Sequence, residues 1–266
     1  MESANELREK IVKEYPRLGP HDSFCFSCQP GISCFNKCCN DINIFLTPYD
    51  IVRLKNRLKI SSGEFLEKYT LIPIEENLRH PVVMLRMRDD NMNCPFVDEE
   101  KGCTVYEDRP WACRMYPIGV AAPKESEAIA AAEGEFYFLL KEDVCKGFEN
   151  GKEWTVSEWL DNQNVLEYNV LGDYFKEITL HDKLQKAQAI EPVKLEMFYM
   201  VCYDIDKFRE FVFGSTFLKR FEVDEYQIEE MKRDDAELLK FGFQWLRFAM
   251  YGERTMKLRN EYMNAR

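Results

Sequence analysis

The stretch FCFSCQPGISCFNKCCN, residues 24–40, holds half of the ten cysteines in this chain of 266 residues. A core helix or strand does not need thiols at this density. Cysteine thiolate is, however, the soft ligand that zinc and iron–sulfur clusters bind. The rest of the chain is therefore interpreted as the scaffold and the remaining ligands around this loop.

Four more cysteines are single thiols spread over later loops, and Cys202 lies within MFYMVCY, which predicts a buried helix. A buried cysteine usually behaves as a small hydrophobic residue, so we expect no ligation at Cys202. Cys145 lies before Lys146 and Gly147, a turn able to bring this thiol back to the site. The predicted metal ligands are Cys25, Cys28, Cys34, Cys38, Cys39, Cys94, Cys103, Cys113 and Cys145.

The spacing of these thiols favours an iron–sulfur cluster, most simply [4Fe–4S], over zinc. Structural zinc sites usually take their ligands from two close pairs, and here only Cys25 and Cys28 form a C-x2-C pair. Single thiols on separate loops suit a cluster whose irons are approached from several directions. Zinc stays open as the alternative, because loops can converge in space.

The adjacent pair Cys38 and Cys39 bears on the number of metal ions. Neighbouring side chains point to opposite sides of an extended backbone, so two adjacent thiolates there are more easily assigned to different irons or different metals. Nine candidate ligands exceed the needs of one cluster and fill two four-thiolate sites, so the number of centres stays open.

Two arginines near Cys113 are candidates for the surroundings of the cofactor. Arg109 and Arg114 would offset the negative charge of thiolate sulfur. The alternative for Arg109 is an ion pair with Asp108 or Glu107 that fixes the loop. The chain has only three histidines, all poorly spaced for ligation, so we expect an all-thiolate site.

Composition excludes several other classes of protein. The net charge of −11 argues against general binding to a nucleic-acid backbone. No stretch approaches the roughly 20 apolar residues that span a bilayer, and the first residues lack the apolar core of a signal peptide. We therefore expect a cytoplasmic protein without membrane insertion, in a compartment where reduced thiols favour metal over disulfides.

The hydrophobic pattern predicts an α+β fold, with a loop-rich metal-binding part that has short strands, followed by a mainly helical part. Strands are expected at 42–46 and 81–87, and a hairpin at 128–140 turning at Gly134. Capping residues predict helix starts at Thr47, Ser61 and Thr155. Further helices are expected at 1–20, ending in a turn at Gly19-Pro20, as one turn after Pro110, and at 165–178, 193–203, 205–213 and 236–250.

The composition changes near residue 150, where loops and strands give way to helical periodicity. We expect a cysteine-cluster domain over residues 1–150 and a helical extension, packed on it, over residues 151–266. No internal repeat or low-complexity linker separates the two.

The order of the sequence blocks resembles the YkgJ-like cysteine-cluster family, a zinc- or iron-chelating domain with a CxxCxxCC signature. The resemblance rests on the loop ending in Cys38-Cys39, then on LTPYDIVRLKNRL (46–58), CPFV (94–97), GCTVYEDRPWACRMYPIG (102–119) and Cys145-Lys146-Gly147. The gaps before the pair are two, five and three residues rather than two each, so the family's ligand set stays open among Cys25, Cys28 and Cys34.

This resemblance implies a function as well as a metal. Flagellin lysine N-methylases carry a similar cysteine domain, which implies iron–sulfur-dependent methyl transfer with a protein substrate. Three functions remain open: an iron–sulfur protein with a redox or group-transfer role and a protein substrate or redox partner, a zinc module whose helices bind a partner, and a carrier of iron or zinc.

Overall fold

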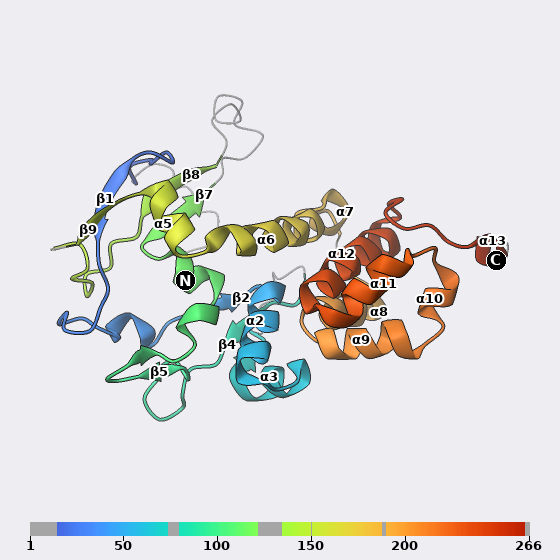
Figure 1. Ribbon diagram of the computed structural model, residues 1–266, viewed down its shortest axis with the longest axis horizontal. Coiled ribbons are helices and arrows are strands. Elements are labelled where there is room, and N and C mark those ends of the chain that lie inside the picture. The colour runs from blue at the N-terminus through green and yellow to red at the C-terminus, as the bar shows by residue number, and fades with distance from the viewer. Residues whose placement is uncertain (1–14, 74–79, 122–134, 150, 188–189, 264–266) are drawn as a thin grey trace. The chain divides into compact units, whose positions relative to one another are not determined.

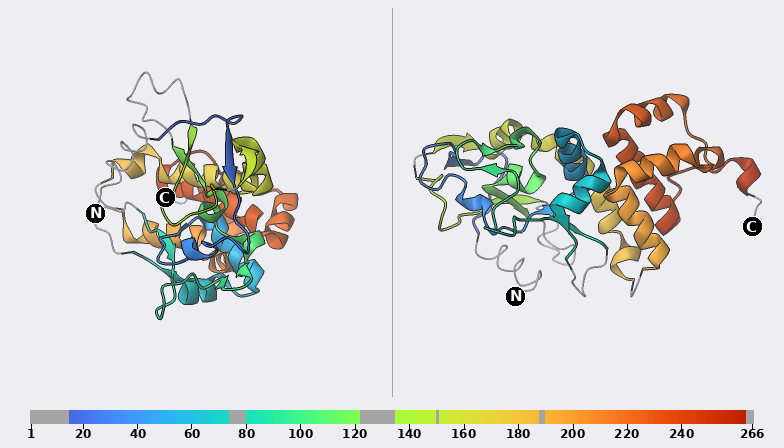
Figure 2. Two further views of the ribbon diagram at one scale, coloured as in Figure 1. Left: turned by 90° about the vertical axis from the view of Figure 1, so that its left-hand side faces the viewer. Right: turned by 90° about the horizontal axis from the view of Figure 1, so that it is seen from below.

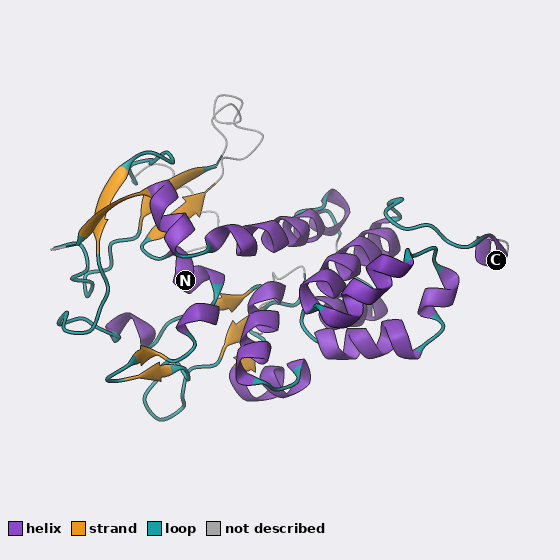
Figure 3. Ribbon diagram, in the orientation of Figure 1, coloured by secondary structure: helices purple, strands orange, loops and turns teal. Residues whose placement is uncertain are grey.

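The protein has an α+β fold, with short antiparallel strands between residues 23 and 155 and mostly helices after them (Figures 1 and 3). The computed structural model describes residues 15–73, 80–121, 135–149, 151–187 and 190–263. In this part of the chain, no helix is both long enough and apolar enough to cross a membrane.

The chain forms two compact units whose segments alternate along the sequence. Unit 1 comprises residues 1–42, 96–104 and 112–166, and unit 2 comprises residues 43–95, 105–111 and 167–266. The expected division near residue 150, which rests on a change of composition, stays a prediction.

An antiparallel ribbon and one helix organise unit 1. Strand β1 (Ser23–Phe26) pairs with β9 (Lys152–Thr155), with Cys25 opposite Glu153. Phe24 and Phe26 are the buried residues of β1, and both rings contact Trp159 of helix α5 (Val156–Asn162). The predicted capping box is confirmed, since Thr155 and Glu158 each accept a hydrogen bond from the backbone N–H of the other.

Four more strands and two short helices complete unit 1. Strand β7 (Ile118–Ala121) pairs with β8 (Phe136–Leu139), and β5 (Val97–Asp98) pairs with β6 (Gly102–Cys103). The 3-10 helix η1 (Lys37–Cys39) lies in the cysteine loop, and α4 (Trp111–Met115) is the helical turn predicted after Pro110. Most of the predicted ligands thus lie on short elements and loops.

The first part of unit 2 contains two helices, α2 (Pro48–Leu58) and α3 (Ser62–Tyr69). Its three-stranded antiparallel sheet has the strand order β2 (Phe45–Leu46), β4 (Val83–Leu85), β3 (Thr70–Leu71). As predicted, Thr47 caps the start of α2, where it forms a capping box with Asp50, and the Ser61 hydroxyl accepts from the Glu64 N–H at the start of α3. The 3-10 helix η2 (Tyr106–Asp108) packs against α2.

The rest of unit 2 is helical. Helix α12 packs against α8, α9 and α11, which lie together in orange to red in Figures 1 and 2. Its apolar face is buried, as the predicted stripe requires. The helices are α6 (Val165–Thr179, which starts at the end of unit 1), α7 (Asp182–Gln185), α8 (Pro192–Cys202), α9 (Ile205–Gly214), α10 (Phe217–Arg220), α11 (Glu225–Arg233), α12 (Asp235–Tyr251) and α13 (Asn260–Met263).

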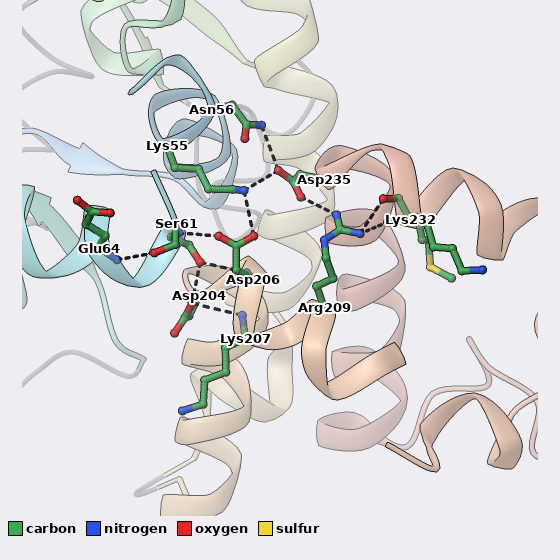
Figure 4. A network of polar contacts seen from close by, with 12 residues as sticks. Lys55, Asn56, Ser61, Glu64, Asp204, Asp206, Lys207, Arg209, Lys232 and Asp235 are labelled. Atoms are coloured by element: carbon green, nitrogen blue, oxygen red, sulfur yellow. Dashed lines mark hydrogen bonds and ion pairs between the residues drawn. The ribbon is translucent and has the colours of Figure 1, made fainter. Parts of the chain in front are cut away.

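A buried ionic network ties α2 to α9 and α12 within unit 2 (Figure 4). Lys55 Nζ lies 2.8 Å from an Asp235 carboxylate oxygen and 3.1 Å from an oxygen of Asp206. Arg209 Nη2 donates to the second oxygen of Asp235 at 2.6 Å. Because only 8% of the Lys55 side chain is exposed, each charge in this network depends on its partners.

Three local predictions differ from the structure. Residues 15–20 contain no helix, and Leu18 instead forms a β-bridge with Tyr137. Residues 1–14 of that predicted helix lie outside the described residues, and the turn at Gly19 is confirmed by the bond from Asp22 N to Gly19 O. The strand predicted at 42–46 is limited to Phe45–Leu46, and that at 81–87 to Val83–Leu85.

The hairpin predicted at 128–140 pairs differently. Its β-prone arm is strand β8, but the partner of β8 is β7, which lies earlier in the chain. Residues 128–134, including the expected turn at Gly134, lie outside the described residues.

Candidate metal centre

The cysteine loop and the loop after β8 are held together in unit 1. The N–H of the peptide that joins Cys145 to Lys146 donates to Cys34 Sγ at 3.1 Å. Ser27 N also donates to Gly147 O at 3.0 Å. The Lys146-Gly147 turn thus returns the chain to the cysteine loop, and it gives the Cys34 sulfur an amide donor that would offset thiolate charge.

Cys38 and Cys39 lie in the one-turn helix η1, so the expectation of an extended backbone at this pair is wrong. The turn is preceded by Asn36, which adopts a left-handed conformation with φ of 65°. The Cys39 thiol hydrogen-bonds to Cys38 and lowers the pKa of the Cys38 thiol to about 7, although burial acts in the opposite direction. The two thiols therefore approach each other, and the assignment to different metals loses its geometric support.

The hairpin that carries Cys103 is docked on the same loop. The side-chain amide of Asn36 donates to the backbone oxygens of Asp98 at 3.0 Å and Glu99 at 3.3 Å. Gly102 has a φ of +80° and lies so close to Phe35 that an added Cβ would stand 2.8 Å from its ring. Glycine is thus required beside Cys103 both by backbone conformation and by the close approach of the two loops.

Tyr116 follows the helix that carries Cys113, and its side chain lies among the thiols. Less than 1 Å² of its hydroxyl oxygen is exposed. Burial first, and then interaction with the Cys145 thiol, raise the pKa of the Tyr116 hydroxyl above its ordinary range, and a weaker influence comes from Cys38. The ring packs edge-to-face on Phe26 at 5.8 Å between centroids.

The two arginines occupy different units. Arg114 is buried, and its Nη1 donates to Gln163 O at 2.7 Å within unit 1. Arg109 belongs to unit 2, where its guanidinium lies 3.8 Å from the centre of the Tyr106 ring. The Asp108 carboxylate, which the alternative pairs with Arg109, binds Arg53 at 2.7 Å. A role of either arginine near a cofactor stays a prediction.

The other predicted ligands lie in varied surroundings. Cys25 and Cys28 are exposed, and Cys94 belongs to unit 2. Cys202 is fully buried, and burial raises the pKa of its thiol well above 9.0, as a packing role requires. No disulfide joins any of the ten cysteines, all of which are described.

Two of the three histidines have packing or capping roles in unit 2. The His80 ring lies 5.2 Å from that of Phe198, and burial lowers the pKa of its imidazole. His181 stacks on Tyr251 and accepts from Lys183 N at the start of α7. Over the described ranges, no three side chains of His, Cys, Asp or Glu are arranged so that they could hold a metal ion.

Sequence reasoning missed Tyr116 and the Lys146 N–H. Tyrosine in the run Cys113-Arg114-Met115-Tyr116 is an ordinary core residue by type. A signal was available in its position three residues after a predicted ligand, which is where a short helix turn places a neighbour. A backbone donor leaves no signal in the sequence.

The donor set fits a thiolate metal centre by its chemistry. Soft sulfur ligands and an amide N–H that donates to sulfur are features of such sites. Comparison with curated proteins and with solved structures found no match. Residues 27–146 match the CxxCxxCC family model, described as a putative zinc- or iron-chelating domain.

Proposed function

We propose that the protein holds an iron–sulfur centre, most simply [4Fe–4S], through thiolates of unit 1. One observation carries the proposal: the N–H of the Cys145–Lys146 peptide donates to Cys34 Sγ, so this peptide brings the segment of Cys145 to the cysteine loop. Cys34, Cys38, Cys39 and Cys145 would be the first ligands, with Cys103 and Cys113 on adjoining elements and Cys25 and Cys28 as the others of unit 1.

An iron–sulfur cluster, when bound, supplies one-electron redox chemistry or a site for group transfer. The chain's own contribution is to gather the thiolates, to donate the Lys146 N–H to sulfur and to bury the ligands partly from water. The expected role is redox or group transfer, such as protein methylation, with a protein substrate or redox partner in a reducing, cytoplasmic compartment.

Zinc is the second candidate, because the family description names zinc or iron. In that case the metal would stabilise a loop-rich unit, and the helices would bind a partner without catalysis.

Anaerobic purification from a strain supplied with both iron and zinc separates the two. Iron with equimolar or greater acid-labile sulfide, together with a brown colour and sulfide-to-iron charge-transfer absorption, supports the iron–sulfur centre. A colourless protein with stoichiometric zinc supports the alternative. Protein that retains neither metal contradicts both.

A further inference from the structure

Asn36 joins the cysteine loop to the hairpin that carries Cys103. Its side-chain Nδ2 donates to Asp98 O at 3.0 Å and to Glu99 O at 3.3 Å, which lie 62 and 63 positions further along the chain. A primary amide has two N–H donors, so one side chain can satisfy both carbonyl oxygens at once. Loop and hairpin both belong to unit 1, and a single residue links them by two hydrogen bonds.

The backbone of Asn36 shapes the cysteine loop at the same time. Its φ of 65° and ψ of −5° lie in the left-handed region, and its carbonyl accepts from Cys39 N at 3.0 Å. Glycine, asparagine and aspartate adopt this conformation most readily. Among these three, only asparagine also carries N–H donors on its side chain. The two roles together specify asparagine at this position.

The turn of the hairpin, which supplies the two carbonyl oxygens, is itself held in place. Asp98 Oδ1 accepts from the backbone N–H groups of Glu100 and Lys101, at 3.0 and 2.8 Å. Strands β5 and β6 pair Val97 with Cys103 directly behind this turn. A shift of the turn would therefore move Cys103 with it.

The residue before Asn36 packs on the same hairpin. A Cβ added to Gly102 would stand 2.8 Å from the Phe35 ring and 3.6 Å from Asn36 Oδ1. Two neighbouring residues of the cysteine loop thus contact the hairpin, at its turn and at strand β6. The hairpin cannot slide along the loop without breaking both contacts.

We propose that Asn36 is a positioning residue of the metal centre, which holds the hairpin against the loop so that Cys103 ligates the same centre as Cys38 and Cys39. This inference rests on the proposed function, because it takes these three thiols as ligands. It assigns thiols from two distant segments to one centre, a point that their spacing in the sequence leaves open.

The test compares three variants with wild-type protein in the full chain. Asn36→Asp keeps the size and the left-handed tendency of the side chain but replaces its donors by acceptors. Asn36→Gly keeps the backbone conformation and removes the side chain altogether. Asn164→Asp is the matched control, because Asn164 is an exposed residue of unit 1 that also has a left-handed φ, of 52°.

Two quantities are measured anaerobically: the rate of native metal release to a chelator, and the thiolate-to-cobalt absorption of metal-depleted protein loaded with Co²⁺ alone. In Asn36→Asp we expect metal release about 10-fold faster, as for other residues that hold metal ligands in place. The effect should be smaller in Asn36→Gly, which loses the donors without adding repulsion, and Asn164→Asp should match wild type. Where Asn36→Asp gives no folded protein, every comparison is made with Asn36→Gly.

The link to Cys103 is tested by a second substitution. Loss of a thiolate ligand weakens thiolate-to-cobalt absorption, so the spectrum of Asn36→Asp should approach that of Cys103→Ser. In a Cys103→Ser background, Asn36→Asp should give little further loss, because the thiolate that Asn36 positions is already absent. A role of Asn36 in overall stability alone would produce the same loss in both backgrounds.

The contradicting results are distinct from one another. If wild type shows thiolate-to-cobalt absorption and Asn36→Asp has the same spectrum and release rate, the role of Asn36 is wrong while the metal centre stands. An equal loss from Asn36→Asp with and without Cys103, or an equal change in Asn164→Asp, would overturn the action through Cys103. Wild-type protein without bound metal or thiolate-to-cobalt absorption would overturn the proposed function and this inference with it.

Discussion

The Lys146 N–H donates to Cys34 Sγ at 3.1 Å, joining two residues 112 positions apart in the chain. This bond ties down a part of the cysteine loop that lies beyond strand β1. A sulfur that already accepts a backbone hydrogen bond is better suited to hold negative charge than an exposed thiol. The hydrogen bond from Lys146 therefore holds Cys34 in place within unit 1.

The protein should keep its metal when all three histidines are replaced. In the triple variant His21→Ala, His80→Ala and His181→Ala, we expect a metal-to-protein ratio equal to that of wild type, because the ligands are thiolates. The ratio is measured on the folded fraction, since His80 packs on Phe198 and its loss weakens unit 2. Loss of metal in His21→Ala alone would identify an imidazole ligand.

Metal removal should loosen unit 1 more than unit 2. In unit 1, short strands and loops provide few other contacts, so binding of the metal by its thiolates contributes much of the folding free energy. In unit 2, helices α8, α9 and α12 bury wide apolar faces that do not depend on metal. Hydrogen exchange on metal-free protein should show lost protection in residues 23–42, 96–104 and 135–149. Equal loss in α12 would mean one cooperative unit.

The sequence predicts contacts between residues that are close together in the chain better than contacts between residues that are far apart in it. The helix starts at Thr47 and Thr155 were predictable because the capping hydroxyl accepts from a backbone N–H only three residues further on. The pairing of β1 with β9 was not, because alternation of Phe24 and Phe26 identifies a strand but not its partner.

The same limit applies to the candidate site. The cysteines stand out by density and residue type, but their arrangement depends on local backbone. Asn36 in a left-handed conformation turns the chain into η1, and this brings Cys38 and Cys39 together where extended backbone would separate them. Asn36 was the available signal, since asparagine tolerates this conformation better than most residues.

Replacing Gly102 should disturb the site without removing a thiol. In Gly102→Ala the added Cβ meets Phe35, and the positive φ is strained, with an expected loss of about 1–3 kcal/mol in unfolding free energy. Chemical denaturation and metal analysis measure the result. Gly63→Ala is the control, because no atom lies within 4 Å of its added Cβ and alanine favours helix α3. Equal stability of the two variants would contradict the close packing of Phe35 on the Cys103 hairpin.

The ionic network of unit 2 should make stability depend on acid. Burial alone would raise the pKa of Asp235, but hydrogen bonds from Lys55 and Arg209 outweigh it and hold the pKa below 3.8. A folded-state pKa below the unfolded value stabilises the fold above pH 3.8, and this contribution is lost as the pH falls through the lower folded value.

Asp235→Asn should therefore cost about 3 kcal/mol near neutral pH, because it leaves Lys55 with a single carboxylate. It should also flatten the fall in stability on acidification. Asp182→Asn, which breaks an exposed pair with Lys186, is the control and should change little. The measurement is urea unfolding between neutral pH and pH 3, and parallel pH profiles for wild type and Asp235→Asn would contradict the role of the network.

The most direct test is the metal content of five single variants purified anaerobically. Cys38→Ser, Cys39→Ser, Cys113→Ser and Cys145→Ser each remove one proposed thiolate, and we expect metal occupancy to fall sharply or to become oxygen-labile. Cys202→Ala removes a buried thiol of unit 2, with a modest packing cost, and should retain the metal of wild type. Loss of metal from Cys202→Ala, together with full retention in Cys38→Ser and Cys39→Ser, would contradict a metal centre organised by the loop at residues 24–40.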